Sequence, residues 1–349
     1  MKIIQTTIDT IPESEFNSDS VLFFDIETTG LSKENSQVYL IGCAYKNDEA
    51  WELKQYFAQS ALDEREVLEE FLDFAQNFKT LVHFNGDRFD VPYIDFKSEF
   101  YGFDFKLSEM ENFDIYKASK PLRKFLGLES MSQKAVERFL KIGRDDEMNG
   151  GELISYYFEY EKTKSKELEK FLLLHNFDDV KGMLNVLKIT NYLGILDGDF
   201  KYEKFEENLN YVTFSLRLNK ELPVPIELEK DGILIAGGDS YLEVCVPIIR
   251  GIASYELKDY ENYYYLPLED KVIHKDVAQF VDKKFKKKAT KKNCCIKKEG
   301  NFILEYAEVF SPKFYIGNDK KKSYFELENL FKAENKQIEK YIKNLISNL

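Results

Sequence analysis

The sequence contains little cysteine and no long apolar run. Its 349 residues include only Cys43, Cys245, Cys294 and Cys295, and no two of these have C-x-x-C spacing. A disulfide framework or a structural zinc site is therefore not expected, which suits a reducing cytosol. No run approaches the roughly 18 apolar residues of a membrane span, and residues 1–16 lack the apolar core of a signal peptide. We expect a cytoplasmic protein that does not associate with membranes.

Positive charge is also scarce. The 49 Lys and Arg residues are outnumbered by 62 Asp and Glu, which gives a net charge of −13. This balance argues against a protein that coats nucleic acid with its whole surface. Residues 271–298 are the exception, because they hold eleven lysines against Asp276 and Asp282. This basic segment is interpreted either as a solvated face or as a local phosphate contact.

The length and the 44% apolar content allow two folded domains. We expect residues 1–199 to form a mixed sheet with helices on both faces, an α/β domain, and residues 200–349 to form a smaller α+β domain. In the first domain the last helix, over 165–192, is expected to be broken or bent near His175. In the second, strands are expected over 211–218, 224–228, 233–235, 241–249 and 252–257. An amphipathic helix over 277–285 with lysines on its outer face and a C-terminal helix over 324–346 complete the prediction.

The first half of the chain is organised around Asp25 and Glu27. The apolar run 21–24 precedes them, as in a strand buried on both faces. The two acids stand at i and i+2, so both carboxylates project from the same side of an extended strand. Burying such a pair costs several kcal/mol unless a cation lies between them. The pattern predicts half of a divalent-metal site, or alternatively a polar strand end that runs into the turn at 28–30.

A second acidic candidate follows the next buried strand, where residues 85–92 read N-G-D-R-F-D-V-P. Asp90 stands at the start of a helix, where it either caps the helix or faces the strand that carries Asp25. Asp87 lies on the turn and is the weaker candidate. His83 and His274 are interpreted as structural, one on a buried strand and the other before a helix.

A histidine and an aspartate lie one turn apart on the last helix of the first domain. His175 and Asp179 have i, i+4 spacing, which places them on the same helix face. In this arrangement the carboxylate can bind a metal while the imidazole takes a proton from water. The alternative is an ordinary surface His–Asp pair.

The order of these motifs resembles the DEDD group of 3′→5′ exonucleases in the ribonuclease-H-like superfamily. Residues 21–193, about half of the chain, are similar to the bacterial YprB-type ribonuclease-H-like proteins. The resembling stretches are 23–30, 81–94, 125–160 and 173–183. The C-terminal half is similar to the tail of some members, which implies no function for it.

The resemblance implies a role for each site residue. Asp25, Glu27, Asp90 and Asp179 would be the acidic metal ligands, and His175 would be the general base. The four-residue spacing from His175 to Asp179 matches the subgroup with tyrosine at this position, whereas the histidine itself matches the other subgroup.

The chemistry implied is metal-assisted phosphodiester hydrolysis. Two Mg²⁺ or Mn²⁺ ions about 3.5–4 Å apart neutralise the attacking and the leaving oxygen. A histidine base must be neutral, so activity should rise through its ordinary pKa of about 6.5. Thr28, Gly30 and Asn85 are expected to position the terminal nucleotide of a single-stranded DNA or RNA 3′ end. Two alternatives stay open, a catalytically silent member that binds nucleic acid or protein and an endonuclease of the same fold.

Overall fold

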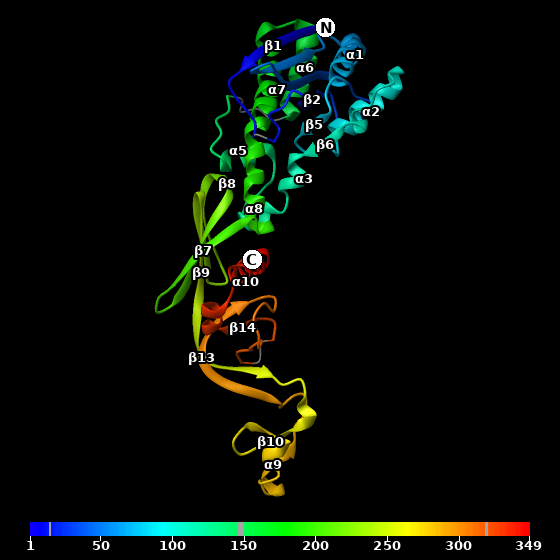
Figure 1. Cartoon of the computed structure of the whole chain (residues 1–349). Coiled ribbons are helices and arrows are strands. Elements are labelled where there is room, and N and C mark those ends of the chain that lie inside the picture. The colour runs from blue at the N-terminus through cyan, green and yellow to red at the C-terminus, as the bar shows by residue number, and fades with distance from the viewer. Residues whose placement is uncertain (14, 146–149, 318–319) are drawn as a thin grey trace. The chain divides into compact units, whose positions relative to one another are not determined.

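The computed structural model describes residues 1–13, 15–145, 150–317 and 320–349. The chain divides into two compact units, Met1–Leu193 and Gly194–Leu349 (Figure 1). Residues 146–149, within one of the stretches that carry the family resemblance, lie outside the described residues. Within the described ranges, every helix is too short or too polar to cross a bilayer.

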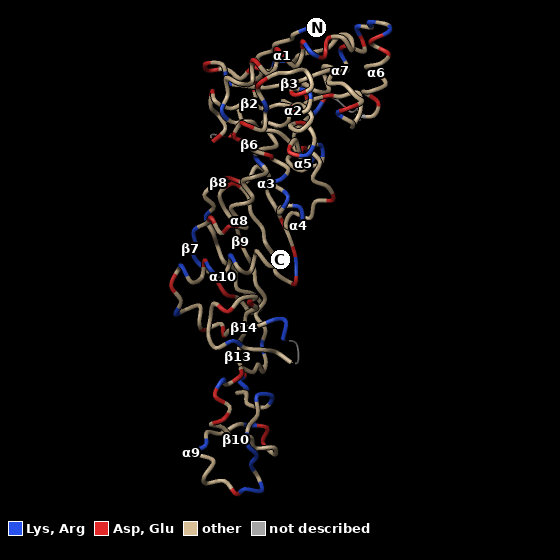
Figure 2. Tube along the Cα trace, turned by 90° about the vertical axis from the view of Figure 1, so that its right-hand side faces the viewer, with Lys and Arg blue, Asp and Glu red and all other residues tan. Residues whose placement is uncertain are grey.

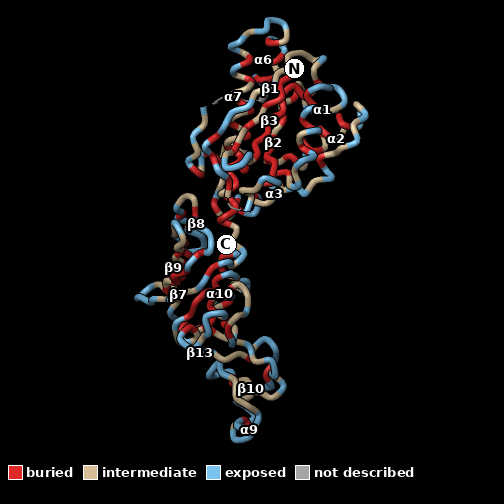
Figure 3. The backbone as a smooth tube through the Cα atoms, turned by 45° about the horizontal axis from the view of Figure 1, so that its top comes forward, coloured by how far each residue is buried: buried red, intermediate tan, exposed pale blue. Residues whose placement is uncertain are grey.

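The first unit is built on a six-stranded mixed sheet in the order β1-β4-β3-β2-β5-β6. Strands β1 to β4 pair antiparallel, whereas β5 and β6 run parallel to β2. The continuous apolar run before Asp25 explains why β2 lies at the centre, where residues 21–24 are fully buried (Figure 3). The strands are β1 Lys2–Ile8, β2 Val21–Thr28, β3 Val38–Asn47, β4 Ala50–Phe57, β5 Thr80–His83 and β6 Glu111–Asp114.

Helices cover both faces of this sheet. On one face Phe24 of β2 stacks on Phe71 of α1 (Glu64–Ala75), with 5.9 Å between ring centroids. Asp25 points to the other face, where Asn176 of α7 (Lys166–Val186) meets it. The remaining helices are α2 Asp90–Tyr101, α3 Ile115–Ser119, α4 Leu122–Phe125, α5 Gln133–Phe139 and α6 Gly150–Thr163. The predicted mixed α/β fold is confirmed.

Helix α7 is not broken at His175, which rules out one of the two predicted alternatives. It runs unbroken to Val186 and continues as a 3₁₀ turn over Leu187–Tyr192. No proline or glycine lies near His175 to break the backbone ladder, and the polar His175 and Asn176 are buried with partners on the sheet. His175 and Asp179 therefore lie on one continuous helix.

The second unit contains a five-stranded antiparallel sheet in the order β14-β13-β9-β8-β7. Its core includes Tyr341 of α10 (Asn335–Ser347), whose ring lies 5.1 Å from that of Phe325 and 5.7 Å from that of Phe214. A smaller sheet has the order β11-β10-β12. The chain also forms two short helices, α8 Leu193–Asp197 and α9 Lys275–Ala278. The strands are β7 Phe200–Glu207, β8 Tyr211–Lys230, β9 Ile233–Glu256, β10 Tyr263–Leu266, β11 Lys271–His274, β12 Lys287–Lys288, β13 Cys295–Glu305 and β14 Ser323–Glu326.

Two predictions for the second unit are wrong in their boundaries. The five separate strands predicted between 211 and 257 are the two long strands β8 and β9, whose pairing shifts register around Leu222 and Ile226, near the two prolines. The C-terminal helix begins at Asn335 rather than at residue 324, because Ser323–Glu326 pairs with β13 as β14.

The predicted amphipathic helix over 277–285 does not form. Helix α9 ends at Ala278, a 3₁₀ turn covers Lys283–Phe285, and Lys287–Lys288 pair with β10. Phe280 is 84% exposed, so this segment has no continuous apolar face to bury. Without such burial, a short helix does not offset the cost of its nucleation. The lysines of the basic segment therefore do not share one helix face.

Candidate active site

Strand β2 presents Asp25 beneath helix α7. The Asn176 side-chain N–H donates to Asp25 Oδ2 at 3.1 Å, and Gln55 of β4 donates to Asn176 Oδ1 at 2.9 Å. Because the amide oxygen of Asn176 accepts from Gln55, its N–H group must face Asp25. The orientation of the Asp25 carboxylate is therefore set by a hydrogen-bonded chain across two strands and a helix.

Gly42 allows this contact. It lies directly opposite Asp25 in the β2–β3 ladder. A Cβ atom there would lie 2.0 Å from Asn176 Oδ1 and 2.9 Å from a methyl group of Val180. Glycine in a strand interior commonly marks such a close approach, and here it brings α7 onto the sheet.

We expect Gly42→Ala to displace Asn176 from Asp25. The added methyl group should lower the free energy of unfolding by about 1–3 kcal/mol, as in an overpacked core. Urea denaturation measures the change. Gly143→Ala, where a Cβ would meet no atom within 4 Å, is the control and should be close to neutral. Equal effects in both variants would contradict this account of Gly42.

Asp90 reaches the same strand from the first turn of α2. Its carboxylate takes backbone hydrogen bonds from its own residue and from Ile26, the residue between Asp25 and Glu27. Asp87 instead lies with Lys117 and Asn112, at 2.9 and 2.6 Å. Of the two acids in the turn, it is Asp90 that faces β2.

Helix α7 contributes His175 and Asp179. His175 Nε2 lies 3.1 Å from Asp179 Oδ2 and 3.5 Å from Glu27 Oε1. The side chain of His175 is only 7% exposed, so the pair is not an ordinary surface pair. The structure thus brings together all five residues singled out in the sequence. Their catalytic and metal-binding roles stay predictions.

Crowding of the carboxylates perturbs their protonation. Burial, followed by the charges of Asp179, Asp90 and Glu27, raises the pKa of Asp25 well above its ordinary value. Burial likewise raises the pKa of Asp90 to about 7, and the charges of Asp114 and Asp179 add to this. Burial also acts to raise the pKa of Asp179, but hydrogen bonds and charge from His175 and Arg144 outweigh it and hold that pKa low. A cation near Asp25 and Asp90 would relieve this repulsion.

The raised pKa of Asp90 predicts a pH-dependent effect of Asp90→Asn in metal-free buffer. A carboxyl with a raised folded-state pKa costs stability once ionised, and this cost grows from about pH 4 to pH 7. Asp90→Asn should therefore stabilise the protein at pH 8 relative to pH 4, by on the order of 2–4 kcal/mol.

Asp87→Asn is the matched control in denaturant titrations at the two pH values. Burial acts to raise the pKa of Asp87, but hydrogen bonds from Lys117 and Asn112 outweigh it and lower that pKa, so its substitution should cost stability at pH 8. The same sign for both variants would argue against electrostatic crowding at Asp90.

Arg144, which the sequence interpretation overlooked, also contacts the cluster. Its Nη2 lies 2.6 Å from Asp179 Oδ1, and its Nη1 lies 3.1 Å from Glu137 Oε2. The Asp145 N–H donates to Asp178 Oδ2 at 2.9 Å, which ties this loop to α7. Asp179 therefore has Arg144 on one oxygen and His175 on the other.

Removing Arg144 should leave the buried carboxylate of Glu137 and the partly buried carboxylate of Asp179 without this partner. We expect Arg144→Met to lower the free energy of unfolding by about 3–5 kcal/mol in EDTA. Because Mn²⁺ would then meet no guanidinium at Asp179, the variant should bind Mn²⁺ more tightly than wild type. Calorimetry measures both quantities. Arg144→Lys, which keeps the charge, is the control and should change the Mn²⁺ affinity less; weaker Mn²⁺ binding by Arg144→Met would show that Arg144 does not compete with the metal.

The three residues predicted to position a nucleotide lie at the ends of β2 and β5. The Thr28 hydroxyl donates to the Gly30 carbonyl at 2.9 Å, and the Thr29 N–H already pairs with Gln37. Asn85 has a left-handed backbone with φ of 65°, and its N–H donates to Asp114. Their role in binding a nucleotide stays a prediction.

The donor set fits a hard divalent cation. Ligand atoms of Glu27, His175 and Asp179 lie within 4.8 Å of one another. Asp25 and Asp90 add carboxylate oxygens beside them, and Mg²⁺ and Mn²⁺ prefer such oxygen ligands. The difference from the sequence prediction is that His175, expected only as a base, is itself part of the metal-sized group.

Sequence reasoning missed Asn176, Arg144 and Gly42. Gly42 interrupts a strand of large side chains, and this was a readable signal of close approach. Asn176 and Arg144 gave no such signal, because neither has a characteristic spacing from the acids it contacts.

The model of the RNase_H superfamily matches residues 22–191 of the chain. Protein YprB of Bacillus subtilis (strain 168) is 27% identical over 180 residues, which cover 51% of this chain and 43% of that protein. The matched part thus spans less than half the length of this relative.

Two solved structures align with lower similarity. The family B DNA polymerase of the archaeon Pyrobaculum calidifontis is 14% identical, with a TM-score of 0.40 over 69% of this chain and 35% of that chain. Exonuclease I of E. coli, in complex with an oligonucleotide, is 10% identical, with a TM-score of 0.32 over 95% and 71%. Similarity at this level does not establish a shared activity.

Proposed function

Residues 22–191 form a ribonuclease-H-like domain, and from the acidic cluster on its sheet we propose that the chain is a metal-dependent nuclease. Its reaction is 3′→5′ exonucleolytic hydrolysis of phosphodiester bonds in DNA or RNA, at a single-stranded end. Two bound Mg²⁺ or Mn²⁺ ions would supply charge neutralisation at the attacking and leaving oxygens. The observation that carries the proposal is the convergence of four carboxylates and a histidine from β2, α2 and α7.

Each residue has a role that its surroundings support. Asp25, oriented by Asn176, would hold both ions, and Glu27 and Asp179 would hold the one that binds water. Asp90 would support the second ion. His175 would accept a proton from the attacking water at Nε2, which requires this nitrogen to leave its contact with Asp179. Thr28, Gly30 and Asn85 would position the terminal nucleotide.

A binding protein without catalysis is the second candidate. The observation in its favour is Arg144, whose guanidinium occupies one oxygen of Asp179 at 2.6 Å. If Arg144 stays in place when a strand binds, Asp179 has less capacity for a metal. Such a protein would bind nucleic acid without cutting it.

The proposal predicts stepwise shortening of single strands from the 3′ end. Wild type with Mn²⁺ or Mg²⁺ is compared with Asp179→Asn on 3′- and 5′-labelled DNA and RNA, and on a circular strand. We expect shortening of linear strands only, lost in Asp179→Asn and in EDTA. His175→Ala should reduce the rate about 10²–10⁴-fold, as expected for the loss of a general base.

Asp87→Asn serves as the matched control, because Asp87 is an acid of the same turn that faces Lys117 instead of β2. It should retain the wild-type rate. Cleavage of the circular strand would favour an endonuclease. No cleavage of any strand, together with measurable Mn²⁺ binding, would favour the binding protein.

A further inference from the structure

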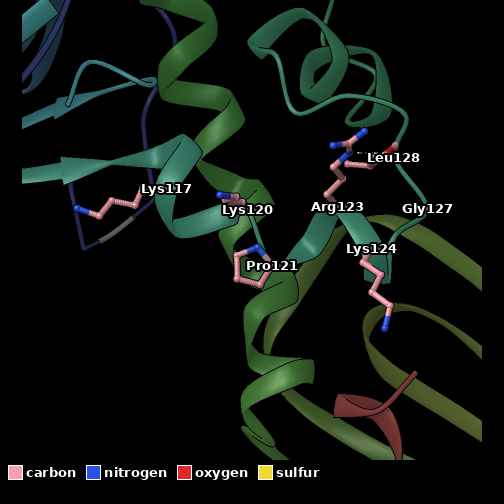
Figure 4. A pocket seen from close by; sticks show the side chains of 7 residues that line it. All are labelled: Lys117, Lys120, Pro121, Arg123, Lys124, Gly127 and Leu128. Carbon is pink, nitrogen blue, oxygen red and sulfur yellow. Dashed lines mark hydrogen bonds between the residues drawn. The ribbon is translucent and has the colours of Figure 1, made fainter. Parts of the chain in front are cut away.

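A basic groove opens beside the acidic cluster, within the first unit. Two adjoining pockets, of about 520 and 890 Å³, share Lys120 and Arg123 in their walls. Three segments line them: the turn from β5 into α2, helices α3 and α4 with the residues between them, and the stretch that leads to α5. We define the basic groove by its cations, which are Arg88, Lys117, Lys120, Arg123 and Lys124. Figure 4 labels the last four of them, and Figure 2 marks Lys and Arg in blue along the backbone trace.

The charges in this groove are largely available to a ligand. Glu129 is the one acidic residue among those that line the two pockets. Within the described parts of the chain, no carboxylate pairs with Arg88, Lys120 or Lys124, whereas Lys117 is taken by Asp87 at 2.9 Å. So high a local density of free cations, in a chain with a net charge of −13, indicates a polyanionic ligand.

Arg123 is held in place by carbonyl groups. Its guanidinium donates to the carbonyl oxygens of Leu128 and Glu129, at 3.4 and 2.7 Å, and the first of these bonds is drawn in Figure 4. These bonds fix the side chain without neutralising its charge. An ordered arginine loses less conformational entropy when it binds a phosphate.

Two residues in the wall of the groove are hydrogen-bonded to residues near the acidic cluster. Gln133, in its wall, donates to the carbonyl oxygen of Asp179 at 2.7 Å. Asn85, which lines the same pocket, donates its N–H to Asp114, whose charge acts on Asp90. These two hydrogen bonds tie the wall of the groove to α7 and to the end of β6, next to the elements that carry the cluster.

Aromatic rings accompany the cations. Phe84 and Tyr116 line the smaller pocket with their ring centroids 6.1 Å apart, and both are half-buried. Unpaired bases stack on such rings, while cations hold the phosphates. This combination favours a single strand over a duplex or an acidic peptide.

We propose that the basic groove binds the sugar-phosphate chain of a single strand behind its 3′ end, and that the first unit, rather than the basic segment 271–298, provides the main phosphate contacts. The direction of the strand in the groove rests on the proposed function. The binding of the strand to the groove does not. It explains how an acidic chain would hold a polyanion close to its own carboxylates.

Binding of a fluorescein-labelled 20-nucleotide strand in EDTA, where no cleavage occurs, tests the groove by anisotropy. The variant Arg88→Glu/Lys120→Glu should weaken binding at least tenfold. Because this variant would pair with two fewer phosphates, the slope of log Kd against log salt should fall by about 1.4. DNA and RNA are run in parallel.

The matched control is Arg65→Glu/Lys170→Glu, which makes the same charge change at two exposed residues of α1 and α7. It should leave both affinity and slope near wild type. Lys283→Glu/Lys284→Glu tests the basic segment in the same way. Loss of binding in this last variant but not in the groove variant would overturn the proposal, as would competition by poly-glutamate equal to that by the strand.

A small chromogenic ester, thymidine 5′-phosphate p-nitrophenyl ester, separates this proposal from the proposed function. The ester is too short to fill the groove, so its Mn²⁺-dependent hydrolysis by the wild-type protein reports on the acidic cluster without the groove. If the groove variant loses strand binding and no form of the protein hydrolyses the ester, the proposed role of the groove is supported and the proposed nuclease activity is rejected. If the groove variant binds the strand as wild type does and wild type hydrolyses the ester, only the proposed role of the groove is rejected.

Discussion

Mutual repulsion between carboxylates is the constraint on which the rest of the first unit depends. Asp25, Glu27, Asp90 and Asp179 come from three elements, and burial, together with the charges of Asp114 and Asp179, raises the pKa of Asp90 to about 7. Such crowding costs folding free energy, which the buried core beneath β2 must offset. A site that retains this cost favours a bound cation over a closed hydrophobic contact.

The neighbouring polar groups resolve the repulsion in different ways. Asn176 orients Asp25 with a neutral hydrogen bond, whereas Arg144 and His175 occupy both oxygens of Asp179 with basic groups. The cluster is therefore asymmetric. Among these contacts, Asp25 has no positively charged partner, whereas Asp179 has Arg144. A metal cation at Asp179 would therefore compete with Arg144. The basic groove lies next to this same side, through Gln133.

The second unit differs from the first, because three charged residues that line one of its pockets, Asp270, Lys297 and Lys320, are exposed and already form ion pairs. Its lysine-rich segment looked like one face of a helix in sequence, but the structure disperses those lysines over α9, a 3₁₀ turn and β12. Several of them are paired, as Lys297 is with Asp270 and Lys298 with Glu326. Charge count alone does not decide whether this segment contacts a phosphate, because pairing and local backbone conformation also determine which lysines are available.

The sequence by itself determined the mixed fold and the five candidate residues of the site. Local rules carry that information: apolar runs define buried strands, and the i, i+2 and i, i+4 spacings fix which side chains share a face. Only the tertiary structure decided that Asn176 faces Asp25, that Arg144 reaches Asp179 and that Lys120 and Arg123 border the same groove as Asn85. These contacts join residues that are far apart in the chain, and the first of them depends on the missing side chain of Gly42, which lets the helix approach the sheet. A local pattern can mark a close approach, as Gly42 does, but it does not say which residue makes the approach.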